Sequence, residues 1–221
     1  MTKTKALRWR TGDRWTSASE KRRRDILLAG KKIFFESGYQ VASIDRIAEA
    51  AGTTKRTVYD HFGSKDDLLG EVVALASREL IDSLPAPDAV SKEPWDGLRT
   101  YVARVRKVAG RPEAVRFYRL VIAEAERRPE LGRRLYETAF RGPERAVAAY
   151  LESCVAEGRV KSHDAAVLAR IILDVAISNP CISGLTGVAD AAENQLGQRA
   201  ADRVVDMLEA ALRLQKPSGG A

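Results

Sequence analysis

The sequence predicts an all-α protein with two helical domains. Its 221 residues are 45% hydrophobic, a share sufficient for a buried core. Apolar residues recur at helical spacing from about residue 20 to residue 215, and no stretch alternates between apolar and polar residues as strands do. A Pro-rich break at residues 84–87, closed by Pro94, divides the chain. We therefore expect a small N-terminal helical bundle followed by a larger helical domain.

Four helices are predicted before that break, over residues 20–38, 44–51, 55–62 and 65–84. Ser43, Thr54 and Ser64 are the expected N-caps of the last three helices, and Asp67 completes a capping box with Ser64. Gly38 is expected to end the first helix, because glycine often follows the last helical turn.

Helical patterns continue to the end of the chain, with Gly or Pro interruptions at residues 110–112, 128–129, 142–143, 158, 179–180 and 184–187. The last two helices are predicted over about Asp164–Ser178 and Ala191–Gln215. We divide the chain into a flexible basic arm (1–19), an N-terminal bundle (20–65), a connecting helix (66–84) and a large helical domain (85–221).

Positive charge is concentrated at the N-terminal end. Residues 1–65 hold 15 Lys and Arg against 7 Asp and Glu, whereas residues 66–221 hold 22 against 23. A basic segment joined to a neutral remainder is typical of a nucleic-acid-binding end, and a solvated basic surface is the alternative. The arm, with Arg8, Arg10 and Arg14, either lies with Lys21–Arg24 along a DNA backbone or minor groove or serves as a solubilising tail.

Other classes of protein are disfavoured. The N-terminus lacks the apolar region of a signal peptide, and the most apolar stretch, Val167–Ile177, is interrupted by charged residues, so no membrane span is predicted. Cys154 and Cys181 have no metal-ligand spacing and are expected to be buried thiols in a reducing cytoplasm, rather than a disulfide. With two histidines in the chain, we expect no catalytic set, no metal and no cofactor, and therefore no enzyme.

The second and third predicted helices have the pattern of a helix-turn-helix, with Gly52 in the turn. Small and apolar residues face inward on the first of the pair, and Val58 and Phe62 anchor the second. This arrangement leaves five residues facing outward, a basic and hydroxyl-rich set suited to phosphates and base edges: Lys55, Arg56, Thr57, Tyr59 and His61. A generic helical hairpin with a basic surface shares the pattern.

The dense run from Ala51 to Lys65 makes the pattern specific. It reads Ala-Gly-Thr-Thr-Lys, then Thr-Val-Tyr-x-His-Phe and Ser-Lys, and Gly38-Tyr39, Ser43-Ile44 and Ile47-Ala48 precede it. Over about residues 21–72 the chain resembles the N-terminal domain of TetR-family regulators. Three departures are small: Leu28 and Phe35 are apolar where the family more often has polar residues, and Arg56 replaces a frequent glycine.

The resemblance implies nine DNA-contacting residues: Ser43, Arg46, Thr54, Lys55, Arg56, Thr57, Tyr59, His61 and Lys65. Lys55 and Arg56 are expected to reach base edges or flanking phosphates, and the others to contact phosphates or cap the recognition helix. The alternatives are a core aromatic for Tyr59, a solvated helix start for Lys65 and plain surface for Arg46. Asp60 is expected to neutralise a neighbouring Arg or to accept from a cytosine amino group.

For the C-terminal domain, the resemblance implies a ligand site and a homodimer formed by pairing of the last two helices. A stripe through Leu168, Ile171, Ile172 and Val175 suits that interface, although it could equally serve the intrachain core. The candidate ligand-lining residues are mostly aromatic: Trp95, Tyr101, Phe117, Tyr118, Val121, Tyr136, Phe140, Tyr150, Asp174 and Cys181.

The expected function is a small-molecule-responsive repressor that binds a palindromic double-stranded DNA operator as a homodimer. The alternatives are a transcriptional activator and a DNA-binding protein without a small-molecule switch.

Overall fold

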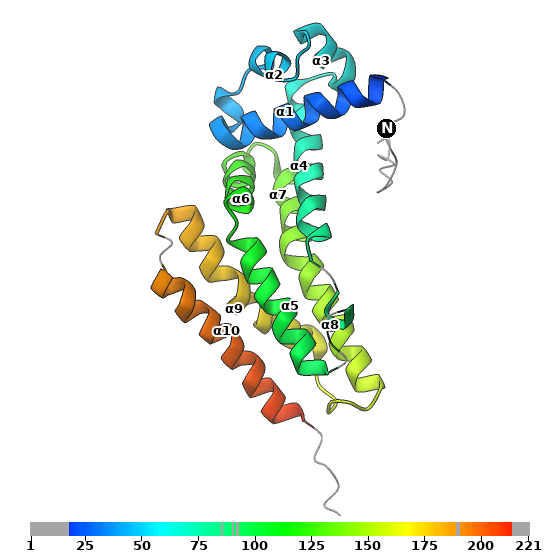
Figure 1. Cartoon of the computed structure of the whole chain (residues 1–221), viewed down its shortest axis with the longest axis vertical. Helices are drawn as coiled ribbons and strands as arrows, with labels where there is room; N and C mark the ends of the chain where they lie inside the picture. The colour runs from blue at the N-terminus through cyan, green and yellow to red at the C-terminus, as the bar shows by residue number, and fades with distance from the viewer. Residues whose placement is uncertain (1–17, 85, 90, 92, 189–190, 214–221) are drawn as a thin grey trace, which may run out of the picture. The chain divides into compact units, whose positions relative to one another are not determined.

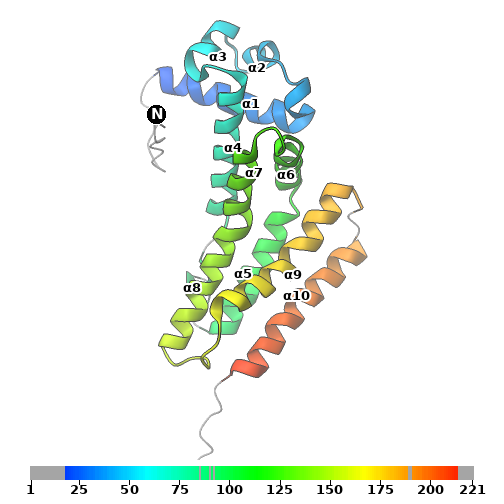
Figure 2. The same cartoon turned by 180° about the vertical axis from the view of Figure 1, so that it is seen from behind.

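The computed structural model describes residues 18–84, 86–89, 91, 93–188 and 191–213. The chain divides into two compact units: unit 1 ends at Val72 and unit 2 begins at Val73. The part of the chain that the structure describes is built of helices and contains no β-strand (Figures 1 and 2). The all-α prediction is thus confirmed. The predicted arm, apart from its last two residues, lies outside the described residues.

Unit 1 consists of α1 (Ala18–Val41), α2 (Ile44–Ala50), α3 (Lys55–Phe62) and the first part of α4 (Lys65–Asp82). Each helix contributes to one core, through Ile26 and Phe34 from α1, Ile47 from α2, Val58 from α3 and Leu68 from α4. Helices α1 and α4 pack closely at Gly30, where an added Cβ would lie 3.3 Å from Leu68 Cδ2.

The predicted caps of unit 1 are confirmed. The backbone N–H groups of Arg46, Thr57 and Asp67 donate to the side chains of Ser43, Thr54 and Ser64, at 3.2, 3.3 and 3.0 Å respectively. The end of α1 differs from the prediction. Gly38 leaves the helical conformation with φ of 75°, but one further turn follows to Val41, so the glycine kinks α1 instead of ending it.

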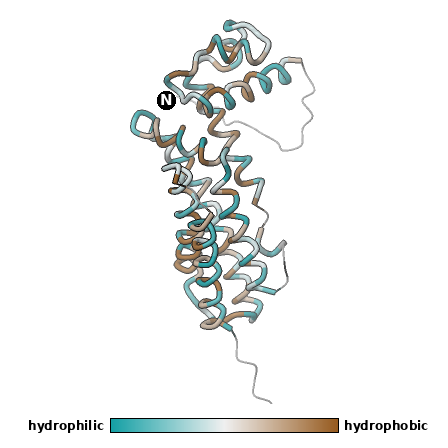
Figure 3. Tube along the Cα trace, turned by 60° about the vertical axis from the view of Figure 1, so that its left-hand side comes forward, coloured by the Kyte–Doolittle hydropathy of each residue, from teal (hydrophilic) through white to brown (hydrophobic). Residues whose placement is uncertain are grey.

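Unit 2 is a bundle around α9. Its helices are α5 (Pro94–Ala109), α6 (Pro112–Glu124), α7 (Pro129–Tyr136), α8 (Gly142–Ala156), α9 (Ala165–Thr186) and α10 (Ala191–Leu212), with the end of α4, the 3-10 turn η1 (Pro87–Ala89) and the π-helical turn η2 (Glu137–Arg141). Helix α9 packs against α5, α8 and α10. Hydrophobic and hydrophilic residues alternate along these helices, as expected for amphipathic helices (Figure 3).

The predicted break at residues 179–180 is wrong, because α9 continues through Pro180 to Thr186. A proline inside a helix lacks the N–H that would bond to the carbonyl four residues earlier, here that of Ala176. Arg106 Nη1 on α5 donates to Ala176 O at 3.3 Å and supplies the missing donor. Since Arg106 is 70 residues away, local sequence reading could not include its contribution.

Helix α9 is long and apolar enough to cross a membrane by length and composition. However, its buried residues, among them Ala169, Ile172 and Ala176, belong to the core of unit 2. The two charged residues that interrupt its apolar run, Arg170 and Asp174, form an exposed ion pair at 2.8 Å. The structure therefore explains the apolar character of α9 as that of a core helix.

Candidate DNA-binding surface and ligand pocket

Helices α2 and α3 are joined by a tight turn that positions α3. Gly52 adopts φ of 60°, a left-handed conformation that favours glycine. Its N–H donates to Glu49 O at 3.0 Å, and the N–H of Thr53 donates to Ala48 O at 2.9 Å. Val58 and Phe62 are buried, so one face of α3 is fixed in the core of unit 1.

The opposite face of α3 is available to a partner, as the pattern predicted. Lys55, Arg56 and Tyr59 are exposed, and Thr57 and His61 are half-buried. With 42% of its surface exposed, Tyr59 is not a core aromatic. The Thr57 hydroxyl lies 3.0 Å from that of Thr54 and so takes part in the helix cap.

The two lysines that flank this face are held in position by neighbours. Lys55 Nζ donates to Asp45 Oδ2 at 3.1 Å, which ties α3 to α2 and raises the pKa of Lys55. Lys65 Nζ lies 4.2 Å from the centre of the Tyr39 ring, and the Tyr39 hydroxyl donates to Asp66. Lys65 is therefore not a freely solvated helix start.

Three further polar residues of unit 1 differ in exposure. Arg46 and Asp60 are exposed, and Ser43 is half-buried as the cap of α2. Asp60 forms no ion pair with another described residue, and the expectation that it neutralises a neighbouring arginine stays a prediction. Its carboxylate lies on the exposed side of α3, where it could accept from a base amino group.

Two arginines of α1 have a role that sequence reasoning missed. Arg22 Nη1 donates to the carbonyls of Ala51 and Gly52, both at 3.2 Å, and so holds the turn of the helix-turn-helix. Arg23 donates to the carbonyl of His61, forms an ion pair with Glu71 and lies over the Phe62 ring. One of the two alternatives drawn from the sequence placed both along DNA with the arm. They instead stabilise unit 1 internally, and no sequence spacing indicates these partners.

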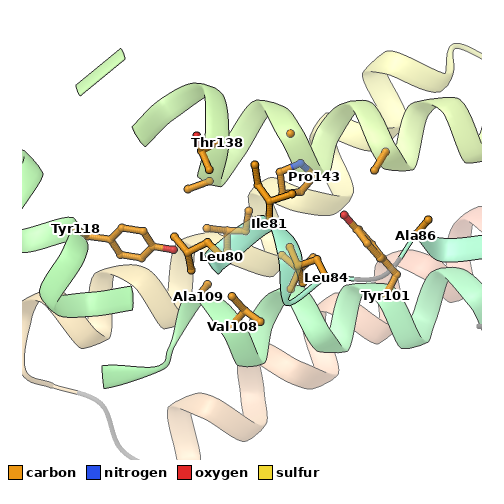
Figure 4. Close-up of a pocket in the computed structure, with 15 residues that line it drawn as sticks. Leu80, Ile81, Leu84, Ala86, Tyr101, Val108, Ala109, Tyr118, Thr138 and Pro143 are labelled. Carbon is orange, nitrogen blue, oxygen red and sulfur yellow. The ribbon is translucent and has the colours of Figure 1, made fainter. Parts of the chain in front are cut away.

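Unit 2 contains a cavity of about 190 Å³ among α4, α5, α6, η2, α8 and α9 (Figure 4). Its walls are mainly aliphatic. Tyr101 and Tyr118, two of the predicted ligand-lining residues, line it. So do Leu80, Ile81 and Leu84, which sequence reasoning missed because α4 was regarded as a connecting helix. Their spacing along one face of α4 was the available signal.

The other predicted ligand residues do not line this cavity. Trp95, Phe117, Val121 and Cys181 are buried in the core, and the Tyr150 hydroxyl donates to Pro94 O at 3.0 Å. The Tyr136 and Phe140 rings stack at 5.6 Å, and Asp174 pairs with Arg170. Cys154 and Cys181 are free buried thiols, as predicted, and burial raises the pKa of each.

A helix-turn-helix whose second helix exposes a basic and hydroxyl-bearing face defines a DNA-binding protein of the regulator class. The comparisons with known proteins identify the family. Residues 26–72 match the family described as bacterial regulatory proteins of the tetR family, and residues 96–213 match the C-terminal domain of AefR-like transcriptional repressors. The chain belongs to the TetR family of bacterial transcriptional regulators.

Individual relatives agree with this assignment. The HTH-type transcriptional repressor Rv1474c of Mycobacterium tuberculosis is 32% identical over 123 residues, which are 50% of this chain and 60% of the relative. The HTH-type transcriptional activator FasR of Mycolicibacterium smegmatis is 41% identical over 49 residues, 22% of each chain. A TetR-family regulator from Mesorhizobium loti superposes with a TM-score of 0.79 at 27% identity, covering 90% of this chain and 100% of that chain.

Proposed function

We propose that this protein is a repressor that binds a palindromic operator as a homodimer and releases it when a small molecule enters the pocket of unit 2. The observation that carries the proposal is the geometry of α3. Val58 and Phe62 fix one face of the helix, while Lys55, Arg56 and Tyr59 are exposed on the other. Such a helix can enter a major groove and contact both phosphates and base edges.

The homodimer is proposed from an exposed apolar face on α9 and α10, which lie side by side (Figures 1 and 2). Val167 and Ile171 on α9 are 51% and 46% exposed, and Leu196 and Met207 on α10 are 53% and 62% exposed. Large exposed apolar side chains on neighbouring helices are typical of interaction sites. Pairing of this face with its copy would form a four-helix bundle and bring two copies of α3 into one molecule.

DNA binding is tested by a gel-shift titration with DNA from upstream of the protein's own gene, at two salt concentrations and with a scrambled competitor. We expect a discrete complex that survives the competitor and weakens with salt. If no complex forms, selection from a random-sequence DNA pool follows. Binding to every DNA alike, with no enriched sequence, would contradict a sequence-specific regulator.

The dimer is tested by light scattering on Ile171→Glu and Met207→Glu. We expect the wild type at twice the protomer mass and both variants shifted towards the protomer mass, because a charge on each side of the interface would be buried. Ile122→Glu is the matched control, since Ile122 is an exposed apolar residue on α6, 55% exposed. A monomeric wild type, or variants that remain dimeric, would contradict the proposed interface.

A reporter gene placed behind the operator tests the direction of regulation. Repression predicts higher expression when the gene for this protein is deleted, whereas lower expression would identify an activator.

A further inference from the structure

The pocket of unit 2 has walls that disfavour a charged ligand. The described residues that line it carry no carboxylate, ammonium, guanidinium or imidazole group. Most are aliphatic, including Leu80, Leu84, Val105, Val108 and Ile177. A charged group that entered would lose its hydration without gaining a counter-charge, which strongly disfavours its binding. The walls therefore select an uncharged molecule.

Three side-chain hydroxyls give this apolar pocket its hydrogen-bonding capacity, those of Tyr101, Tyr118 and Thr138, and the two tyrosines enter it from opposite sides (Figure 4). Tyr101 and Tyr118 are only 2% and 3% exposed, and their hydroxyls point towards the space between them from opposite sides (Figure 4). Neither hydroxyl has a hydrogen-bond partner among the residues that the structure describes. Burial raises the pKa of Tyr101 to about 12 and that of Tyr118 as well, so both are neutral donors at physiological pH. An acceptor atom near each hydroxyl would satisfy it.

The size of the pocket limits the ligand further. A dry apolar cavity of about 150 Å³ accommodates benzene, whereas sites for drug-sized ligands measure about 300–1,000 Å³. At about 190 Å³, this pocket fits one substituted ring or a molecule of similar bulk. Thr138 and Ala139 of the π-helical turn η2 form part of the wall, and such turns are frequent at functional sites.

We propose that the pocket binds a small uncharged molecule with an apolar middle and a hydrogen-bond acceptor at each end, held between the hydroxyls of Tyr101 and Tyr118. A single-ring aromatic ester with an ether oxygen opposite is a simple member of this class. The inference rests on the proposed function only where it treats this molecule as the effector. Binding to the pocket does not itself require DNA.

The test is calorimetric titration of the full chain with three probes of similar size. Methyl 4-methoxybenzoate is neutral and has acceptors at both ends, 4-methoxybenzoate is the anion of the parent carboxylic acid, and p-cymene lacks acceptors. We expect the ester to bind at least about tenfold more tightly than the anion, because the anion loses its hydration in the pocket. We expect the ester also to bind more tightly than p-cymene, because only the ester accepts from the two hydroxyls.

Substitutions in the pocket test whether the probe binds there. Tyr101→Phe and Tyr118→Phe should each weaken ester binding about three- to tenfold, the value of one hydrogen bond, and leave p-cymene binding unchanged. Ala146→Trp should abolish binding of both probes, because Ala146 lines the cavity. Tyr136→Phe is the matched control, since Tyr136 lies outside the cavity and its hydroxyl accepts from Arg170. It should bind the ester as the wild type does.

Three results would overturn the proposal: binding of the anion as tight as that of the ester, no ester binding up to its solubility limit, or ester affinity unchanged in both Tyr→Phe variants. An operator titration on the same preparation separates the two proposals. Operator binding without ester binding rejects the ligand class alone, whereas ester binding without sequence-specific DNA binding rejects the regulatory function alone.

Discussion

Both units use an arginine from a neighbouring helix to satisfy backbone carbonyls that lack a helical donor, but they do so in different surroundings. In unit 1, Arg22 donates to Ala51 O and Gly52 O, at a turn that the glycine in the sequence predicts. In unit 2, Arg106 donates to Ala176 O, in the middle of α9, where Pro180 removes the donor.

Their burial distinguishes the two arginines. Arg22 is half-buried at the edge of unit 1, whereas Arg106 is 6% exposed and also donates to Asn194 O on α10. Burial lowers the pKa of Arg106. A buried donor has no water to replace its partner, so the comparison indicates that unit 2 depends more strongly on its arginine than unit 1 does.

The largest expected contrast between the units concerns alkali, because the tyrosines with strongly raised pKa values lie in unit 2. Burial raises the pKa of Tyr101 and Tyr150 to about 12, and that of Tyr118 further, from the ordinary value of 10.0. The folded state then keeps protons that the unfolded state has released. The free energy of unfolding should therefore be unaffected by these groups below pH 10 and fall as the pH rises towards 12.

At pH 11 the loss is about 1.4 kcal/mol for each of Tyr101 and Tyr118, or about 3 kcal/mol for the two together. Urea unfolding followed by circular dichroism at pH 8 and pH 11 measures it. Tyr118→Phe should show a pH-dependent loss that is smaller by about 1.4 kcal/mol. The same pH dependence in wild type and variant would mean that Tyr118 is not buried as described.

Removal of the buried arginine is the second test. Arg106→Ala should lower the free energy of unfolding by about 2–3 kcal/mol, because two hydrogen bonds are lost and a cavity remains. In a Pro180→Ala background the loss should be about 1 kcal/mol smaller, because residue 180 then has its own N–H for Ala176 O. Lys107→Ala, at the exposed neighbouring position, is the control. An equal loss in both backgrounds would refute the link between Arg106 and Pro180.

The corresponding change in unit 1 should have a smaller effect. Arg22→Ala should cost about 1 kcal/mol, because water can reach the carbonyls of Ala51 and Gly52. Loosening of the turn should also weaken operator and non-operator DNA binding by a similar factor. Lys21→Ala, an exposed neighbour on α1, controls for the loss of charge. Equal weakening by both variants would mean that the charge of Arg22, and not its hold on the turn, affects DNA binding.

The same contrast explains what the sequence could predict. In unit 1, Ser43, Thr54 and Ser64 cap the helices through contacts three residues away, so the starts of α2, α3 and α4 were predicted to the residue. In unit 2, the continuation of α9 depends on an arginine 70 residues away, and the prediction failed. Hydrogen bonds between residues close in the sequence can be inferred from the local pattern, whereas hydrogen bonds from a donor far along the chain cannot.

The candidate sites follow this rule as well. The exposed face of α3 follows from helical periodicity once Val58 and Phe62 are identified as anchors. The pocket instead requires knowledge of which helices surround it. The aromatic residues of the sequence therefore indicated Tyr101 and Tyr118, whereas nothing in the local pattern assigned Leu80 and Leu84 on α4 to the pocket.

If the exposed face of α3 binds DNA, substitutions on that face change the affinity for the operator, which fluorescence anisotropy of labelled operator DNA measures over a series of salt concentrations. Arg56→Ala should weaken operator binding. If Arg56 contacts a phosphate, the slope of log affinity against log salt should fall in magnitude by about 0.9. If it contacts a base, the preference for that base should fall by about 1–3 kcal/mol. Arg133→Ala, an exposed arginine on α7, should leave affinity and slope unchanged. Wild-type affinity and salt slope in Arg56→Ala, Lys65→Ala and Tyr59→Phe alike would mean that this face of α3 does not bind DNA.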